Sequence, residues 1–63
     1  MREKLIEKRK KKGLTQENMA YKLNVARTTY TGYENGNFSP SLEISLKIKE
    51  ILNYKKDDLW DIT

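Results

Sequence analysis

Apolar residues recur along this chain at helical spacing, in short segments separated by turn-forming residues. In the segment 26–35, Ala26, Tyr30 and Tyr33 fall within an arc of about 60° on an ideal helix. The opposite side carries short polar side chains, including three threonines, which are poor helix formers. Residues that lower helix stability on one exposed face indicate that this face is a binding surface. The alternative is a weak helix that is held in place only by its tyrosines.

Two helices are predicted before this segment. The first covers residues 3–12 and ends at Gly13, a plausible C-cap. The second begins after Thr15, a good N-cap, and ends at Asn24, which tolerates the left-handed conformation. Its capping box is expected to be incomplete, because the third helical position holds Asn18 rather than Glu or Gln. Its apolar face consists of Met19, Ala20 and Leu23.

The strongest aliphatic pattern lies in the stretch SLEISLKIKEILN, residues 41–53. Either Ser39, which precedes Pro40, or Ser41 is expected to cap this helix. Its six aliphatic residues are more than one buried face requires, which suggests a second contact surface. The expected core stripe is Leu42, Leu46, Ile48 and Leu52, widened by Ile44 and Ile51.

A short last turn is predicted over residues 54–59, and the chain closes with the apolar residues Trp60 and Ile62. No strand signal precedes Trp60, so the pattern predicts an all-α fold of five helices in a single domain, residues 1–63. A domain of this length buries only about 60% of its unfolded surface. Its core is therefore thin, and we expect a partner subunit to help stabilise it.

The charge balance favours an anionic partner. The chain has 13 Lys and Arg against 9 Asp and Glu, a formal net charge of +4, which suits nucleic acid or an acidic membrane. Basic residues crowd the end of the first helix at positions 8–12, where they either stabilise the helix dipole or contact phosphates. Candidates for non-specific attraction to DNA are Arg2, Lys10, Lys11 and Lys12.

Several classes of protein are disfavoured. The chain has no cysteine and no histidine, which argues against disulfides, a zinc module and an enzyme with the usual nucleophile or base. No cofactor, metal ion or small-molecule ligand is indicated. No apolar run approaches the ~20 residues of a membrane span, and the N-terminus lacks the apolar segment of a secretory signal. We therefore expect a cytoplasmic protein that does not bind membranes.

The segments 16–23 and 26–35 are joined by a tight turn at Asn24 and Val25, which is the helix-turn-helix pattern. Ala20 is small enough for the two helices to cross closely, and Val25 can fill the angle between them. Tyr30 and Tyr33 are expected to anchor the second helix so that its polar side faces outward.

The stretch GLTQENMAYKLNVARTTYTGYENG resembles the helix-turn-helix of the Cro/CI-type repressors, the XRE family. The later stretches NFSPSLEISLKIKEILN and DDLW resemble that family's fourth and fifth helices, so the resemblance covers nearly the whole chain. It implies a compact five-helix domain like that of lambda repressor. It also implies a homodimeric transcriptional regulator, expected to be a repressor, that binds a palindromic operator in double-stranded DNA.

The resemblance also implies roles for individual residues. Arg27, Thr28 and Thr31 match positions expected to contact bases, and Arg27 has the geometry to bind guanine O6 and N7 together. Thr31 also matches a position that touches the sugar-phosphate backbone. The expected phosphate contacts are Thr15, Gln16, Asn35 and Asn37, and the resemblance also implies that Gln16 braces the recognition helix. Arg9 and Glu34 resemble an ion pair that joins the first helix to the recognition helix, and we expect it to be partly exposed.

Three positions depart from the family pattern. Gly32 stands where a long base-contacting side chain is frequent, so base readout is expected to be lean. Lys8 stands at a position usually held by a core leucine, so its stem must pack while its ammonium group reaches solvent. Ala26 replaces a common serine, which removes one possible cap.

The surplus of apolar residues at the C-terminal end fits a protein partner. The expected homodimer interface is Ile51, Tyr54, Trp60 and Ile62. A protein-interaction module of the same fold, such as an antitoxin or an accessory regulator subunit, is the alternative function, because fold does not fix function. The polar threonine face and Arg27 favour DNA binding over that alternative.

Overall fold

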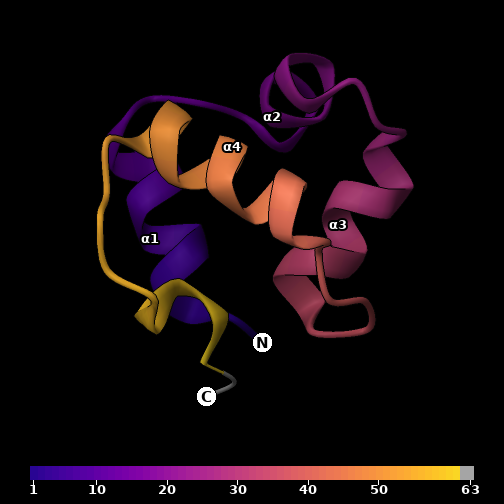
Figure 1. Cartoon of the computed structure of the whole chain (residues 1–63). Helices are drawn as coiled ribbons and strands as arrows, with labels where there is room; N and C mark the ends of the chain where they lie inside the picture. Colours follow the sequence, from indigo (N-terminus) through magenta and orange to yellow (C-terminus); the bar gives the residue numbers. More distant parts are fainter. Residues whose placement is uncertain (62–63) are drawn as a thin grey trace.

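The computed structural model describes residues 1–61, which form four α-helices and one short 3-10 helix (Figure 1). The predicted all-helical fold is confirmed, and no strand occurs among these residues. The predicted fifth helix is a single 3-10 turn, because only three of the described residues after α4, Asp58–Trp60, take up helical backbone. The elements are α1 (Glu3–Lys11), α2 (Gln16–Leu23), α3 (Arg27–Asn35), α4 (Leu42–Leu52) and η1 (Asp58–Trp60).

The helices surround one small core. Figure 1 shows α4 crossing the middle of the molecule, with α1 on one side and α3 on the other, and the N-terminus lying close to η1. α2 packs mainly on α3, and η1 packs on α1. None of the helices in residues 1–61 has the length and apolar character needed to cross a bilayer. The buried core residues are Leu5, Met19, Ala20, Leu23, Tyr30, Tyr33, Ile48, Leu52 and Leu59.

The start of α2 is capped more completely than predicted. The Thr15 hydroxyl accepts a hydrogen bond from the Asn18 backbone N–H at 3.0 Å, as expected for an N-cap. The Thr15 backbone N–H in turn donates to Asn18 Oδ1 at 3.0 Å, which closes the capping box. The prediction of an incomplete box was wrong, because the asparagine amide oxygen reaches the same N–H that Glu or Gln usually accepts from.

The turn between α2 and α3 has the predicted construction. Asn24 has a φ of 58° and ends α2 in the left-handed conformation. Ala20 of α2 is buried in the core, and Val25 is half-buried against it. The small residue and the left-handed turn together set the angle at which α3 leaves α2.

The inner face of α3 is formed by its tyrosines. The rings of Tyr30 and Tyr33 meet edge to face with centroids 6.2 Å apart, and both are buried. Burial, reinforced by the carboxylate of Glu34, raises the pKa of Tyr30 above its ordinary value. Ala26 was predicted to share this face, but it is the exposed N-cap residue with extended backbone, so the helix begins one residue later.

The aliphatic stripe of α4 differs from the prediction. Ser41 caps the helix, accepting from the Ile44 N–H at 3.2 Å. Leu42 and Leu46 are exposed, 76% and 55%, rather than part of the core. The buried stripe consists of Ile48 and Leu52, with Ile44 and Ile51 half-buried beside them. Six aliphatics create two overlapping stripes on one helix, and the one through Ile44, Ile48 and Ile51, at i, i+4 and i+7, is turned to the core.

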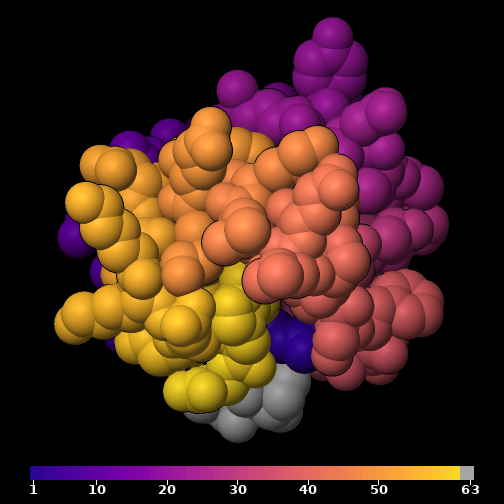
Figure 2. Space-filling model, viewed as in Figure 1, coloured from indigo at the N-terminus to yellow at the C-terminus, as the bar shows by residue number. Residues whose placement is uncertain are grey.

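Arg2 is buried, 5% exposed, so the prediction that it attracts DNA from the surface was wrong. Its guanidinium donates to three backbone carbonyls, those of Tyr33 at 2.6 Å, Phe38 at 2.7 Å and Trp60 at 3.1 Å. It also donates to Ser39 Oγ at 3.3 Å. Figure 2 accordingly shows N-terminal atoms between the C-terminal turn and the loop that follows α3. One buried side chain thus fixes the end of α3, the following loop and η1.

Candidate nucleic-acid interface

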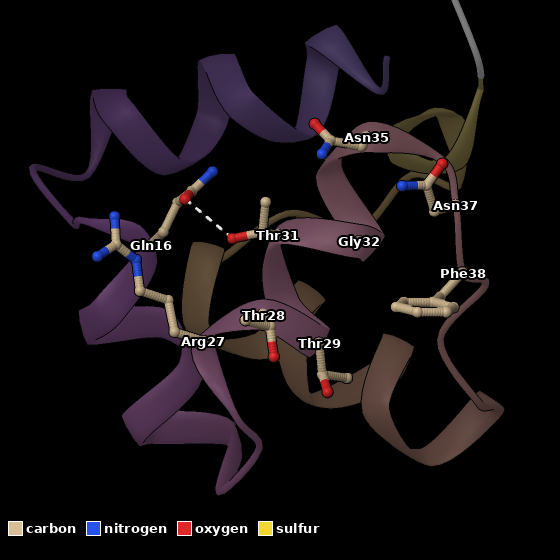
Figure 3. A pocket seen from close by; sticks show the side chains of 9 residues that line it. All are labelled: Gln16, Arg27, Thr28, Thr29, Thr31, Gly32, Asn35, Asn37 and Phe38. Atoms are coloured by element: carbon tan, nitrogen blue, oxygen red, sulfur yellow. Dashed lines mark hydrogen bonds between the residues drawn. The ribbon is translucent and has the colours of Figure 1, made fainter.

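A shallow groove runs along the outward face of α3 (Figure 3). α2 contributes one residue to it, α3 contributes six, and the loop after α3 contributes two. Apart from Thr15, all of the residues that the family resemblance assigns to base or phosphate contact line this groove, so the fold brings them onto one surface. The lining residues are Gln16, Arg27, Thr28, Thr29, Thr31, Gly32, Asn35, Asn37 and Phe38.

The first turn of α3 carries the predicted base-reading side chains. Arg27 and Thr28 are its first two residues, and both are exposed. Thr31 follows one turn later and is half-buried at the edge of the groove. Thr29 lines the same groove and was not assigned a role from the sequence. The arrangement offers a guanidinium donor and several hydroxyl groups to a ligand that lies along α3.

Gln16 connects the two helices of the motif. Its Nε2 donates to Glu34 Oε1 at 2.9 Å, and its Oε1 accepts from the Thr31 hydroxyl at 3.1 Å (Figure 3). The predicted bracing of the recognition helix is therefore present. Because both ends of the Gln16 amide are bonded to α3, the side chain holds α2 and α3 in a fixed relation.

The ion pair predicted for Arg9 and Glu34 is present, but it is buried and not partly exposed. Arg9 Nε lies 2.6 Å from Glu34 Oε2, and the two side chains are 10% and 1% exposed. The burial follows from the packing of α1 directly against α3, which covers the pair. Arg9 also donates to the Leu14 carbonyl at 2.8 Å. Removal of either partner leaves a buried charge, which costs far more than loss of a surface pair.

The other expected phosphate contacts lie at the two ends of the groove. Asn35 ends α3, Gly36 turns the chain with a φ of 86°, and Asn37 follows; both asparagines are exposed. Thr15 is exposed at the start of α2, outside the groove. Its oxygen serves as the acceptor of the cap, which leaves the hydroxyl hydrogen to donate to an anion.

Phe38, like Thr29, lines the groove and was not assigned a role from the sequence. It lies in the loop after α3, and its ring occupies the space that a side chain at Gly32 would fill. Gly32 itself is buried. The signal in the sequence was a glycine on the polar face of a helix followed, six residues later, by a large apolar residue in a polar loop.

Two of the residues expected at a dimer interface, Tyr54 and Trp60, line different hollows. Tyr54 lines a hollow with Lys8 and Leu52, whereas Trp60 lies against Pro40 and other residues near the start of α4. The Tyr54 hydroxyl donates to Asp58 at 2.7 Å, and this carboxylate raises the pKa of Tyr54 to about 12.

Lys8 packs its stem and holds its ammonium group 5.2 Å from the centroid of the Tyr54 ring. Ile51 is half-buried against the core, and Ile62 lies outside the described residues.

Comparison with known proteins agrees with the geometry. A helix-turn-helix family model matches residues 5–59. An uncharacterized HTH-type transcriptional regulator of Archaeoglobus fulgidus is 40% identical over 60 residues, 95% of this chain and 86% of that protein. One of Methanocaldococcus jannaschii is 38% identical over 95% of this chain and 91% of its own length. YqaE of Bacillus subtilis, also described as HTH-type, is 44% identical over 90% of this chain, which is 49% of YqaE.

No solved structure gives a significant match to this chain. The family model spans α1 to η1, and the relatives from Archaeoglobus and Methanocaldococcus align over nearly their whole length. The match thus includes the groove on α3 as well as the core that supports it. The chain belongs to the XRE-type helix-turn-helix family of transcriptional regulators.

Proposed function

We propose that this protein represses transcription by binding a specific sequence in double-stranded DNA, with α3 lying in the major groove. The observation that carries the proposal is the groove on α3, where the exposed side chains of the helix are polar and the helix is held by hydrogen bonds from Arg9 and Gln16 to Glu34. A major groove about 12 Å wide admits one α-helix. A rigid helix with outward polar side chains suits that purpose, because rigidity fixes which base edge each side chain meets.

The residues divide into two roles. Arg27 donates to guanine O6 and N7, and Thr28 meets a thymine methyl group or a base-edge acceptor. Phosphate contacts come from Gln16, Asn35 and Asn37 along the groove and from Thr15 at the start of α2. These phosphate contacts set the register of α3 on the duplex, and the base contacts select the sequence.

Base analogues test the groove assignment. Replacing guanine by 7-deazaguanine in a bound site removes the major-groove N7 acceptor, and replacing guanine by inosine removes only the minor-groove amino group. We expect binding to weaken with the first change and to persist with the second. The reverse pattern would place the protein in the minor groove and would contradict the proposal.

Binding is expected to weaken steeply with salt. A protein that neutralises several phosphates shows a log–log slope of about −0.9 per phosphate against salt concentration. Lys10, Lys11 and Lys12 are exposed at the end of α1, and their joint replacement by glutamine should weaken binding to all sequences and flatten the slope. The matched control is Lys47→Gln on α4, an exposed lysine paired with Glu43, which should leave the slope unchanged. Fluorescence anisotropy over a salt series measures both the affinity and its salt dependence. A wild-type affinity that does not change with salt would exclude DNA as the partner.

We also propose that the protein acts as a homodimer on a palindromic operator. Two recognition helices about 34–36 Å apart read two half-sites and double the information available to one. Trp60 is half-buried, and Leu42 and Leu46 are the exposed aliphatic side chains of α4, so they are the apolar surface that a second copy would cover.

Sedimentation equilibrium tests the dimer. Leu46→Lys and Trp60→Ala should each shift the wild-type dimer toward monomer. Tyr21→Lys is the matched control, because Tyr21 is 87% exposed on α2 and lies outside the proposed interface. A wild type that remains monomeric at high micromolar concentration would contradict the dimer in free solution, and an equal shift in all three variants would contradict the interface.

A further inference from the structure

The ring of Phe38 completes the surface of α3 at the place where the helix has no side chain. A Cβ at position 32 would overlap two carbons of this ring, so the ring lies directly on the helix backbone. The loop after α3 therefore places an aromatic side chain at the position on α3 where Gly32 has none. Figure 3 shows the ring in the groove, on the same side of α3 as Thr28 and Thr29.

The backbone of Phe38 is held by hydrogen bonds on both sides of its Cα. Its backbone N–H donates to the Gly32 carbonyl at 3.2 Å, and its carbonyl accepts from the buried Arg2 guanidinium at 2.7 Å. The ring nevertheless stays 53% exposed. A large apolar side chain that is held in place and half exposed beside donor side chains has the character of a contact residue, because exposure of the ring gives no stability to the free protein.

We propose that Phe38 is a specificity-determining residue that contacts the 5-methyl group of a pyrimidine in the major groove. The inference rests on the proposed function, since it requires α3 to lie in that groove. An aromatic ring has no hydrogen bond to offer a base edge, and the methyl group at C5 is the apolar feature of that groove. Thymine carries this group in ordinary DNA, and 5-methylcytosine presents the same group on a different base.

The test uses the DNA site that the wild-type protein selects from a random pool. Each thymine in turn is replaced by uracil, which removes only the methyl group. At one thymine the wild type should lose about fourfold in affinity, the value expected for one buried methyl group. Phe38→Ala should bind thymine and uracil equally there, while it keeps the wild-type preference at the guanine assigned to Arg27.

A second variant tests whether the position of the Phe38 ring matters in addition to its presence. Gly32→Ala keeps Phe38 but pushes the ring off the helix, so it should also lose the discrimination between thymine and uracil. Thermal melting shows whether each variant is folded, and the salt slope of binding shows whether its phosphate contacts persist.

The outcomes distinguish the proposals. If Phe38→Ala retains the wild-type discrimination, or if no uracil substitution affects the wild type, Phe38 does not read a methyl group and the inference fails while the proposed function stands. If the wild type selects no sequence at all, the proposed function fails first. A cytosine placed at the sensitive position, compared with 5-methylcytosine, shows whether the methyl group alone is read: methylation should restore about fourfold in affinity.

Discussion

Glu34→Ala is expected to destabilise the protein by about 3–5 kcal/mol, the range for breaking a buried ion pair from one side. The Glu34 carboxylate is 1% exposed and accepts hydrogen bonds from Arg9 of α1 and Gln16 of α2. It therefore links both of these helices to α3. Without it, the Arg9 guanidinium remains buried and uncompensated. Because small domains have little stability in reserve, the variant should be largely unfolded near 37 °C in a thermal melt followed by circular dichroism.

Two controls identify the cause. Glu43→Gln removes the acidic partner of an exposed pair on α4, and its effect should be about 0.5 kcal/mol or less. The double variant Arg9→Met, Glu34→Leu removes both buried charges and should recover most of the stability that Glu34→Ala loses. A double variant no more stable than Glu34→Ala would show that the carboxylate acts through something other than its charge.

Arg27→Ala is expected to remove the preference for one base pair while reducing overall affinity less. Loss of a bidentate contact to guanine corresponds to about 1–3 kcal/mol of discrimination at that position, or roughly 5- to 150-fold. Arg27 is exposed at the first position of α3, so its replacement removes no core contact and should leave the melting temperature unchanged. Affinities for the selected site and for variants at each guanine, measured at one salt concentration, give the discrimination directly.

A matched control is Lys22→Ala, an exposed cation in the last turn of α2 that lies outside the groove. It should leave base preference unchanged. If Arg27→Ala weakens binding to every sequence equally, Arg27 contacts a phosphate and the assignment of base readout to it is wrong.

The helix-turn-helix itself was predictable from the sequence because local signals agree there. Asn24 carries the left-handed turn, Ala20 allows the close crossing, and Tyr30 and Tyr33 anchor α3, as the spacing indicated. Each of these signals acts within a few residues. Where propensity, spacing and turn chemistry point to one arrangement, tertiary packing has little room to override them.

Features decided by tertiary contact were predicted less well. Leu42 and Leu46 satisfy the same helical spacing as the buried stripe, and only the placement of α4 on the core decides between the two. The local sequence does not distinguish Arg2 from other cations near an N-terminus. Its burial depends on hydrogen bonds to three backbone carbonyls that are far from it in the sequence. The ring of Phe38 packs on Gly32 because the loop after α3 folds back onto the helix. Helical periodicity in the sequence does not predict such a contact.

The central claim is that α3 reads DNA sequence, and selection from a random pool of duplexes tests it most directly. The expected result is enrichment of a short palindrome whose half-sites lie about 10 base pairs apart, with at least one guanine in each half. The same selection with Arg27→Ala should lose that guanine and keep the rest of the site. A wild-type pool that remains random after repeated rounds would contradict the account.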